Sequence, residues 1–90
     1  MNGAFLIRDT ETGVHYIADT KSGMSVRLNR DGSVYTSDKS IKDIDKATFN
    51  YDYIEECTLI TDNETGVQYT SWSYKGVQPR IGADGKPYIK

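Results

Sequence analysis

The chain has 90 residues, a length that suits one domain with one hydrophobic core. Hydrophobic residues make up 37% and aromatic residues 11%, which is enough to fill a small core and argues against a disordered chain. Eleven basic residues stand against 13 acidic ones, and the net charge of −2 argues against binding a nucleic-acid polymer through bulk charge.

Several further classes of protein are excluded because the residues or patterns they need are missing from the sequence. Cys57 is the only cysteine, so the chain has neither an internal disulfide nor a metal cluster built on paired cysteines. No apolar run approaches the ~18 residues of a membrane span, and no secretory signal pattern is present. We therefore expect a cytoplasmic protein that uses no metal and no cofactor and does not bind a membrane.

An internal repeat organises the chain. Shifting the sequence by 53 positions aligns residues 6–35 with residues 59–88 without a gap, and 13 of the 30 aligned pairs are identical. Ordinary composition gives roughly two identities by chance. The identical pairs include Tyr16 with Tyr69 and Arg27 with Arg80. The chain therefore contains two copies of one supersecondary unit.

Each copy has the pattern of a β-meander. Residues 4–8 and 57–61 are apolar, β-rich runs, and each is followed by a loop of the form Asp-x-Glu-Thr-Gly. In such a loop the aspartate binds the backbone ahead of it and the glycine takes a positive φ. Alternating residues predict two further strands, then an Asp-Gly turn and a last short strand. Pro79 and Pro87 cannot donate to a ladder, so their strands are expected at sheet edges.

The segment between the copies has no counterpart in the first copy. Aromatic residues at positions 49, 51 and 53 alternate with polar ones, which predicts an additional strand with one aromatic face. Ile41 and Ile44 follow Ser40 at helical spacing, which is compatible with one short helical turn near 40–46.

The expected fold is all-β. Two meanders related by pseudo-twofold symmetry would form a small sheet, a sandwich or an open barrel. The single domain spans 1–90. Its expected parts are repeat A at 4–36, the connector with the extra strand at 37–56, and repeat B at 57–89.

The second copy contains Asp-x-x-Thr-Gly-Val-x-Tyr, a glycine-bearing loop, an apolar strand and a closing Asp-Gly-Lys-Pro. In these features it resembles a family of short bacterial and phage proteins of uncharacterised function. The matching positions are Asp62, Thr65, Gly66, Val67, Tyr69, Gly76, Asp84, Gly85, Lys86 and Pro87. The first copy matches less closely because it lacks the Lys-Pro. The resemblance implies an all-β fold and a bacterial or phage source, and it implies no activity.

Candidate catalytic groups are few. The pairs Asp9 with Glu11 and Asp62 with Glu64 have the residue types of a glycoside hydrolase site, but turn geometry already favours aspartate in these loops. We interpret them as turn residues whose glutamates face solvent. His15, the only histidine, lacks a nearby nucleophile motif and is expected on a strand surface. No enzyme activity is predicted.

Candidate binding residues are concentrated in the third strand of each copy and in the second turn of repeat B. Arg27 and Arg80 would converge on one anion or carboxylate if the copies pack about a twofold axis. The alternative is that each arginine stacks on a tyrosine or pairs with a cross-strand acid. The candidates are Arg27, Arg80, Trp72, Tyr74, Lys75, Gln78 and Tyr69. Aromatic rings with polar anchors suit a planar ligand or a protein surface, although coverage of the core or of an edge explains them equally well.

These features predict a non-enzymatic binding protein, expected to form a homo-oligomer. The first hypothesis is that it antagonises a process of a bacterial host by sequestering a small anionic, nucleotide-like ligand. The alternative is a protein inhibitor or assembly module that uses exposed strand edges and the loop at Trp72 and Tyr74. A hydrolase acting through the carboxylate pairs is the third hypothesis.

Overall fold

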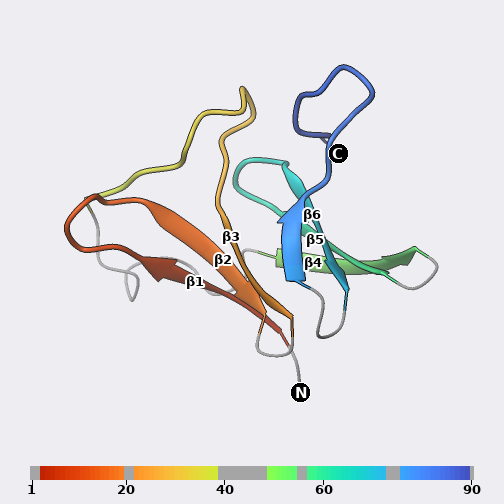
Figure 1. Ribbon diagram of the computed structural model, residues 1–90, viewed down its shortest axis with the longest axis horizontal. Coiled ribbons are helices and arrows are strands. Elements are labelled where there is room, and N and C mark those ends of the chain that lie inside the picture. The colour runs from red at the N-terminus through yellow and green to blue at the C-terminus, as the bar shows by residue number, and fades with distance from the viewer. Residues whose placement is uncertain (1–2, 20–21, 39–48, 55–56, 73–75, 90) are drawn as a thin grey trace.

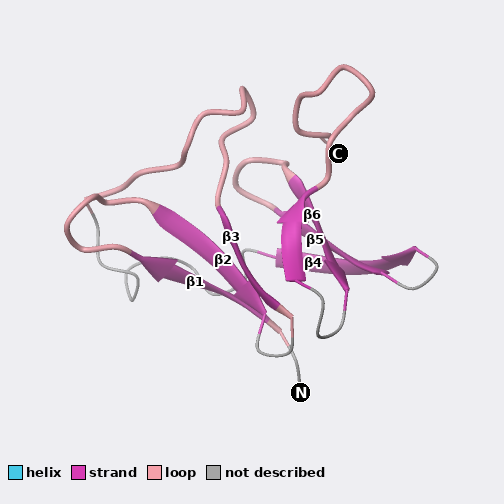
Figure 2. Cartoon of the chain, viewed as in Figure 1, coloured by secondary structure: helices cyan, strands magenta, loops and turns pink. Residues whose placement is uncertain are grey.

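The computed structural model describes residues 3–19, 22–38, 49–54, 57–72 and 76–89, and these form two antiparallel sheets (Figure 1). The first sheet has the order β1-β2-β3 and the second the order β4-β5-β6-β7. The strands are β1 (Ala4–Arg8), β2 (His15–Asp19), β3 (Gly23–Val26), β4 (Phe49–Ile54), β5 (Cys57–Asp62), β6 (Gln68–Trp72) and β7 (Gly76–Pro79). The predicted all-β fold is confirmed, with no helix in the described ranges (Figure 2). The helical turn expected near 40–46 lies outside them.

The two copies of the repeat form equivalent meanders. In the first sheet Leu6 pairs with Ile17, and in the second sheet the equivalent residues, Leu59 and Thr70, pair in the same register. The extra strand predicted between the copies is β4, which pairs along the whole of β5. The second sheet is therefore a repeat of the first with one strand added at its edge.

The first loop of each meander has the predicted turn chemistry. The Asp9 carboxylate accepts a hydrogen bond from the Glu11 amide at 2.8 Å, and the Asp62 carboxylate accepts one from the Glu64 amide at 3.1 Å. The loops close at glycines with φ of +77° and +81°, a region that glycine enters without a Cβ penalty. Local sequence thus fixes two loops of the same shape in different halves of the molecule.

The ends of the meanders are less regular than predicted. The last short strand of each copy is reduced to isolated bridges, Leu28 with Val34 and Ile81 with Pro87. Pro79 lies in β7, which is the edge strand of its sheet, as the missing N–H predicts.

The hydrophobic core lies between the two sheets, where β3 is adjacent to β7. The first sheet contributes Ile17, with Ala4 and Leu6 packed around it. The second contributes Ile60, Tyr69 and Val77, together with Val67 from the loop before β6. Tyr69, a binding candidate from the sequence, is buried in this core, whereas its equivalent Tyr16 is only half-buried.

This difference between equivalent tyrosines shows how the halves are arranged. Side chains alternate between the two faces of a strand, so Ile17 and Tyr16 lie on opposite faces of the first sheet. The first sheet faces the core with the Ile17 face, and the second sheet faces it with the Tyr69 face. The two copies thus contribute different faces of the same meander to the core, although their equivalent glycines, Gly23 and Gly76, lie next to each other. We call this use of a different face by each copy head-to-tail packing.

Candidate functional site

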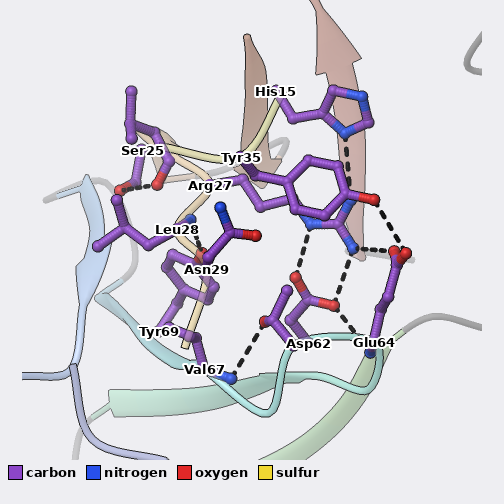
Figure 3. Close-up of polar contacts among 12 residues, drawn as sticks. His15, Ser25, Arg27, Leu28, Asn29, Tyr35, Asp62, Glu64, Val67 and Tyr69 are labelled. Carbon is purple, nitrogen blue, oxygen red and sulfur yellow. Dashed lines mark hydrogen bonds and ion pairs between the residues drawn. The ribbon is translucent and has the colours of Figure 1, made fainter. Parts of the chain in front are cut away.

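The most polar part of the interface between the sheets is built around Arg27, which follows β3. Its guanidinium binds both oxygens of Asp62, with Nε 2.6 Å from Oδ2 and Nη2 2.9 Å from Oδ1 (Figure 3). Nη2 also donates to Glu64 Oε2 at 2.8 Å. Arg27 and Asp62 are completely buried, while the Glu64 side chain is 51% exposed. A cation from repeat A is therefore neutralised by two carboxylates from the first loop of repeat B.

Tyr35 and His15 complete the Arg27 cluster. The Arg27 guanidinium lies 4.1 Å from the centre of the Tyr35 ring, and the Tyr35 hydroxyl donates to Glu64 Oε1 at 2.9 Å. Nη1 of Arg27 lies 3.1 Å from Nδ1 of His15. Because an arginine N–H can only donate, Nδ1 accepts this bond and the neutral ring carries its proton on Nε2. Burial and the nearby positive charge of Arg27 lower the pKa of His15 below its ordinary value of 6.5.

This cluster decides between the sequence-based interpretations of these residues. For Arg27, the predicted tyrosine stack is confirmed. Its acidic partners come from the other sheet and not from a neighbouring strand of its own sheet. The turn role of Asp62 is confirmed, and an ion pair that the loop pattern alone did not indicate is added to it. The prediction of a surface position for His15 is wrong, because head-to-tail packing turns the His15 face of the first sheet inward.

Arg80 has the same local surroundings as Arg27 but no acid. Its Nη1 donates to Gln68 Oε1 at 2.8 Å, and its guanidinium lies 4.3 Å from the centre of the Tyr88 ring. Gln68 and Tyr88 are the repeat equivalents of His15 and Tyr35. Within the described ranges no carboxylate forms an ion pair with Arg80. The two arginines thus bind different groups instead of sharing one anion.

The remaining sequence-predicted residues divide into three groups. Trp72 and Gln78 line one shallow hollow with Cys57, Thr70, Gly76 and Val77, and Trp72 is 48% exposed. Tyr69 is buried, its hydroxyl accepts a hydrogen bond from the Leu28 amide at 2.8 Å, and burial raises its pKa to about 12. Tyr74 and Lys75 lie outside the described residues.

Trp72, Gln78 and Arg80 are on the same side of the second sheet. Thr70 pairs directly with Gln78, and residues two apart along a strand share a face. We call this surface the Arg80 face; it consists of Leu59, Thr61, Gln68, Thr70, Trp72, Gln78 and Arg80, of which Leu59, Thr61 and Gln68 are buried. It is the face that points away from the core in the second sheet, and its equivalent in the first sheet is the face that packs on the core.

A second surface was not identified from sequence. Phe5, Ile7 and Met24 are exposed by 44%, 37% and 50% on the side of the first sheet that faces away from the core. Cross-strand pairing places them beside Tyr16, Ala18 and Val26. We call this surface the outer face; it consists of Phe5, Ile7, Tyr16, Ala18, Met24 and Val26. The signal was the continuous apolar run from Ala4 to Ile7, which places apolar side chains on both faces of the strand and does not say which face is covered.

Comparison of the chain with known protein families, with curated proteins and with solved structures gave no match. The resemblance to short bacterial and phage proteins therefore stays a prediction. In the part of the chain that the structure describes, no three histidine, cysteine, aspartate or glutamate side chains are grouped as metal ligands. The same residues include no helix with the length and apolarity needed to cross a membrane.

Proposed function

We propose that this protein is a non-enzymatic protein-binding module that docks through the outer face of its first sheet. The observation that carries the proposal is the exposure of Phe5, Ile7 and Met24 next to one another on a regular antiparallel surface. Contiguous exposed apolar area of this kind is uncommon on monomeric proteins and is typical of interaction sites. An assembly or inhibitor module, the alternative hypothesis from sequence, is thus favoured over ligand sequestration, but with the outer face as its contact surface instead of the strand edges and the loop at Trp72 and Tyr74.

The repeat supplies a second reason. The equivalents of Ile7 and Met24 in the second sheet are Ile60 and Val77, and both are buried against the first sheet. The same face of the same meander therefore already acts once as a protein-docking surface, inside this molecule. A partner that fits the outer face presents a flat strand surface with aliphatic side chains at its centre.

The test is site-specific photocrosslinking from the outer face. A photoreactive phenylalanine analogue replaces Phe5, and in a matched control it replaces Lys86, an exposed residue of the closing hairpin. Irradiation in a bacterial lysate is expected to give a discrete protein adduct from position 5 and none from position 86. Mass spectrometry identifies the partner, and its affinity is then measured with both proteins pure.

The variant Met24→Glu places a charge in the centre of the proposed contact, so the affinity of the purified pair should fall about tenfold or more. An affinity unchanged by this substitution, or equal adducts from positions 5 and 86, contradicts the proposal.

A second candidate function uses Arg80. Its guanidinium is held over the Tyr88 ring at 4.3 Å without an acidic partner in the described ranges, and such a pair suits a planar anion that stacks and accepts hydrogen bonds. This supports the binding of a nucleotide-like ligand; its removal from a process of a bacterial host is the remaining part of this second proposal. Calorimetric titration with cyclic nucleotides should give heat that Arg80→Ala abolishes and Lys86→Ala preserves; no heat from any of them contradicts this function.

A further inference from the structure

We infer that the partner of the outer face is the Arg80 face of a second copy of this chain, so that chains associate head to tail. The inference rests on the proposed function and names its partner. It follows from the arrangement of the repeat: the first sheet uses its Arg27 face and the second sheet its Tyr69 face within the molecule. The two remaining faces are the repeat equivalents of the two that already fit each other. On the Arg80 face, Gln68 and Leu59 are buried, whereas Trp72, Gln78 and the neighbouring Tyr88 are exposed.

The contacts between the two halves give the template for the intermolecular contact. Within the chain, Arg27 of one meander binds Asp62 and Glu64 of the other, and Glu64 also accepts from Tyr35. The repeat equivalents of Arg27 and Tyr35, 53 positions later in the chain, are Arg80 and Tyr88. The repeat equivalents of Asp62 and Glu64, 53 positions earlier, are Asp9 and Glu11. All four residue types are unchanged by the shift.

Both sides of this second contact are already in the binding geometry. The loop of Asp9 and Glu11 has the same carboxylate-to-amide hydrogen bond and the same positive-φ glycine as the loop that receives Arg27. Glu11 is exposed, and in the described ranges neither carboxylate forms an ion pair. The Arg80 guanidinium is stacked on its tyrosine as Arg27 is. Such preorganisation lowers the entropy cost of association.

Backbone and apolar contacts extend the match. The Leu28 amide donates to the Tyr69 hydroxyl within the chain, and the equivalent pair between chains is the Ile81 amide and the Tyr16 hydroxyl. Ile7 and Met24 of the outer face would meet Thr70 and neighbouring residues of the Arg80 face.

The Arg80 face is more polar than its counterpart in repeat A, because Thr70 stands where the first sheet has Ile17. The intermolecular contact therefore buries less apolar surface than the intramolecular one, and it lacks the advantage of covalent linkage. We expect reversible association, with a population that depends on protein concentration.

The outer face and the Arg80 face point away from the core on the two packed sheets, so a single pair of chains cannot make both contacts with each other. Each added chain presents the same outer face and the same Arg80 face, so association continues to a ring or to an open filament. This distinguishes the arrangement from a symmetric dimer, in which one patch meets itself.

The experiment is a charge exchange across the proposed contact, followed by light scattering on the purified full chain over a range of concentrations. The wild-type mass should rise past that of a dimer. Arg80→Glu alone and Glu11→Arg alone should each leave monomers, because each brings like charges together. An equimolar mixture of the two variants should associate again, because every contact between one variant and the other then joins an acidic side chain to a basic one.

Lys86→Glu is the matched control, since it makes the same charge change as Arg80→Glu at an exposed position outside the proposed contact, and it should associate like the wild type. Circular dichroism checks that each variant keeps its strands. A wild-type chain that stays monomeric, a dimer that resists both substitutions, or a mixture that stays monomeric overturns the inference. The proposed function fails separately, when position 5 gives no specific protein adduct in the lysate.

Discussion

Arg27 and Arg80 occupy the same position in two copies of one meander and stack on equivalent tyrosines, at 4.1 and 4.3 Å, yet only Arg27 binds carboxylates within the described ranges. The local sequence is therefore sufficient for the stack, and the acid partners come from the way the halves pack. Substituting the two arginines in turn therefore separates the effect of the tyrosine stack from the effect of the ion pair between the sheets.

We expect Arg27→Ala to destabilise the protein by about 3–5 kcal/mol, because the completely buried Asp62 would lose its counter-charge. Urea unfolding followed by circular dichroism measures the change in the free energy of unfolding. The control is Arg80→Ala, which strands no buried acid and should cost much less when measured at low protein concentration. Equal losses from both substitutions would contradict the role given to the ion pair.

The stability of the fold should fall as the pH drops below 6.5. Burial and Arg27 lower the pKa of His15 in the folded state, so the unfolded chain, with its pKa near 6.5, binds the proton more readily. The contribution of neutral His15 is complete above pH 6.5 and is lost as the pH falls from there toward the lowered folded value. Asp9 and Asp31 titrate in a separate window, because their pKa values lie below 3.8.

Repeat B supplies the control for this pH dependence. Gln68 takes the place of His15 and accepts a hydrogen bond from Arg80 through a group that does not titrate. The variant His15→Gln should therefore keep the acceptor for Arg27 and flatten the stability profile between pH 6.5 and the lower window. A profile as steep as that of the wild type would show that other groups cause the loss.

Removing the Tyr69 hydroxyl should also destabilise the fold. It is the acceptor for the Leu28 amide, which is partly buried between the halves, and an unsatisfied buried donor costs about 1–3 kcal/mol. Thermal unfolding of Tyr69→Phe measures the loss. Tyr16→Phe changes the equivalent residue on the outer face and should be close to neutral in the monomer; a larger effect there than at position 69 would reverse the assignment of core and surface.

Gly66 should tolerate substitution less well than Gly85, although their φ angles are +81° and +82°. Alanine at either position has the conformational cost of the left-handed region, about 1–2 kcal/mol. At Gly66 the new Cβ would also lie 3.1 Å from Ile89 Cγ2 and 2.7 Å from the end of the Arg30 side chain, whereas at Gly85 it meets nothing within 4 Å. Chemical denaturation of the two variants gives the difference, and equal costs would exclude a packing contribution.

Much of the fold could be predicted because it is specified locally. The loop from Asp62 to Gly66 contains its own turn signal, and the aromatic alternation from Phe49 onward predicts β4. The repeat then predicts the same turns, strands and register in the other meander. Turn type, strand existence and register follow from residues that are close together in the chain.

The relation between the halves could not be predicted in the same way. Which face of a meander is covered depends on residues far away in sequence, and both faces of the first sheet carry apolar side chains, such as Leu6 on one and Ile7 on the other. The burial of His15 and the exposure of Met24 both follow from that choice of face. The sequence also does not show that Asp62, the turn aspartate of repeat B, is the counter-ion of Arg27 in repeat A.

Because the chain is synthesised from its N-terminus, Arg27 is made before its partner Asp62. The two residues are 35 positions apart, so a ribosome adding ~5–20 residues per second produces the cation about 2–7 s before the first of its two acids. During that interval the nascent N-terminal half must keep its guanidinium hydrated and cannot adopt its final packing. Native closure therefore waits for the C-terminal half to emerge.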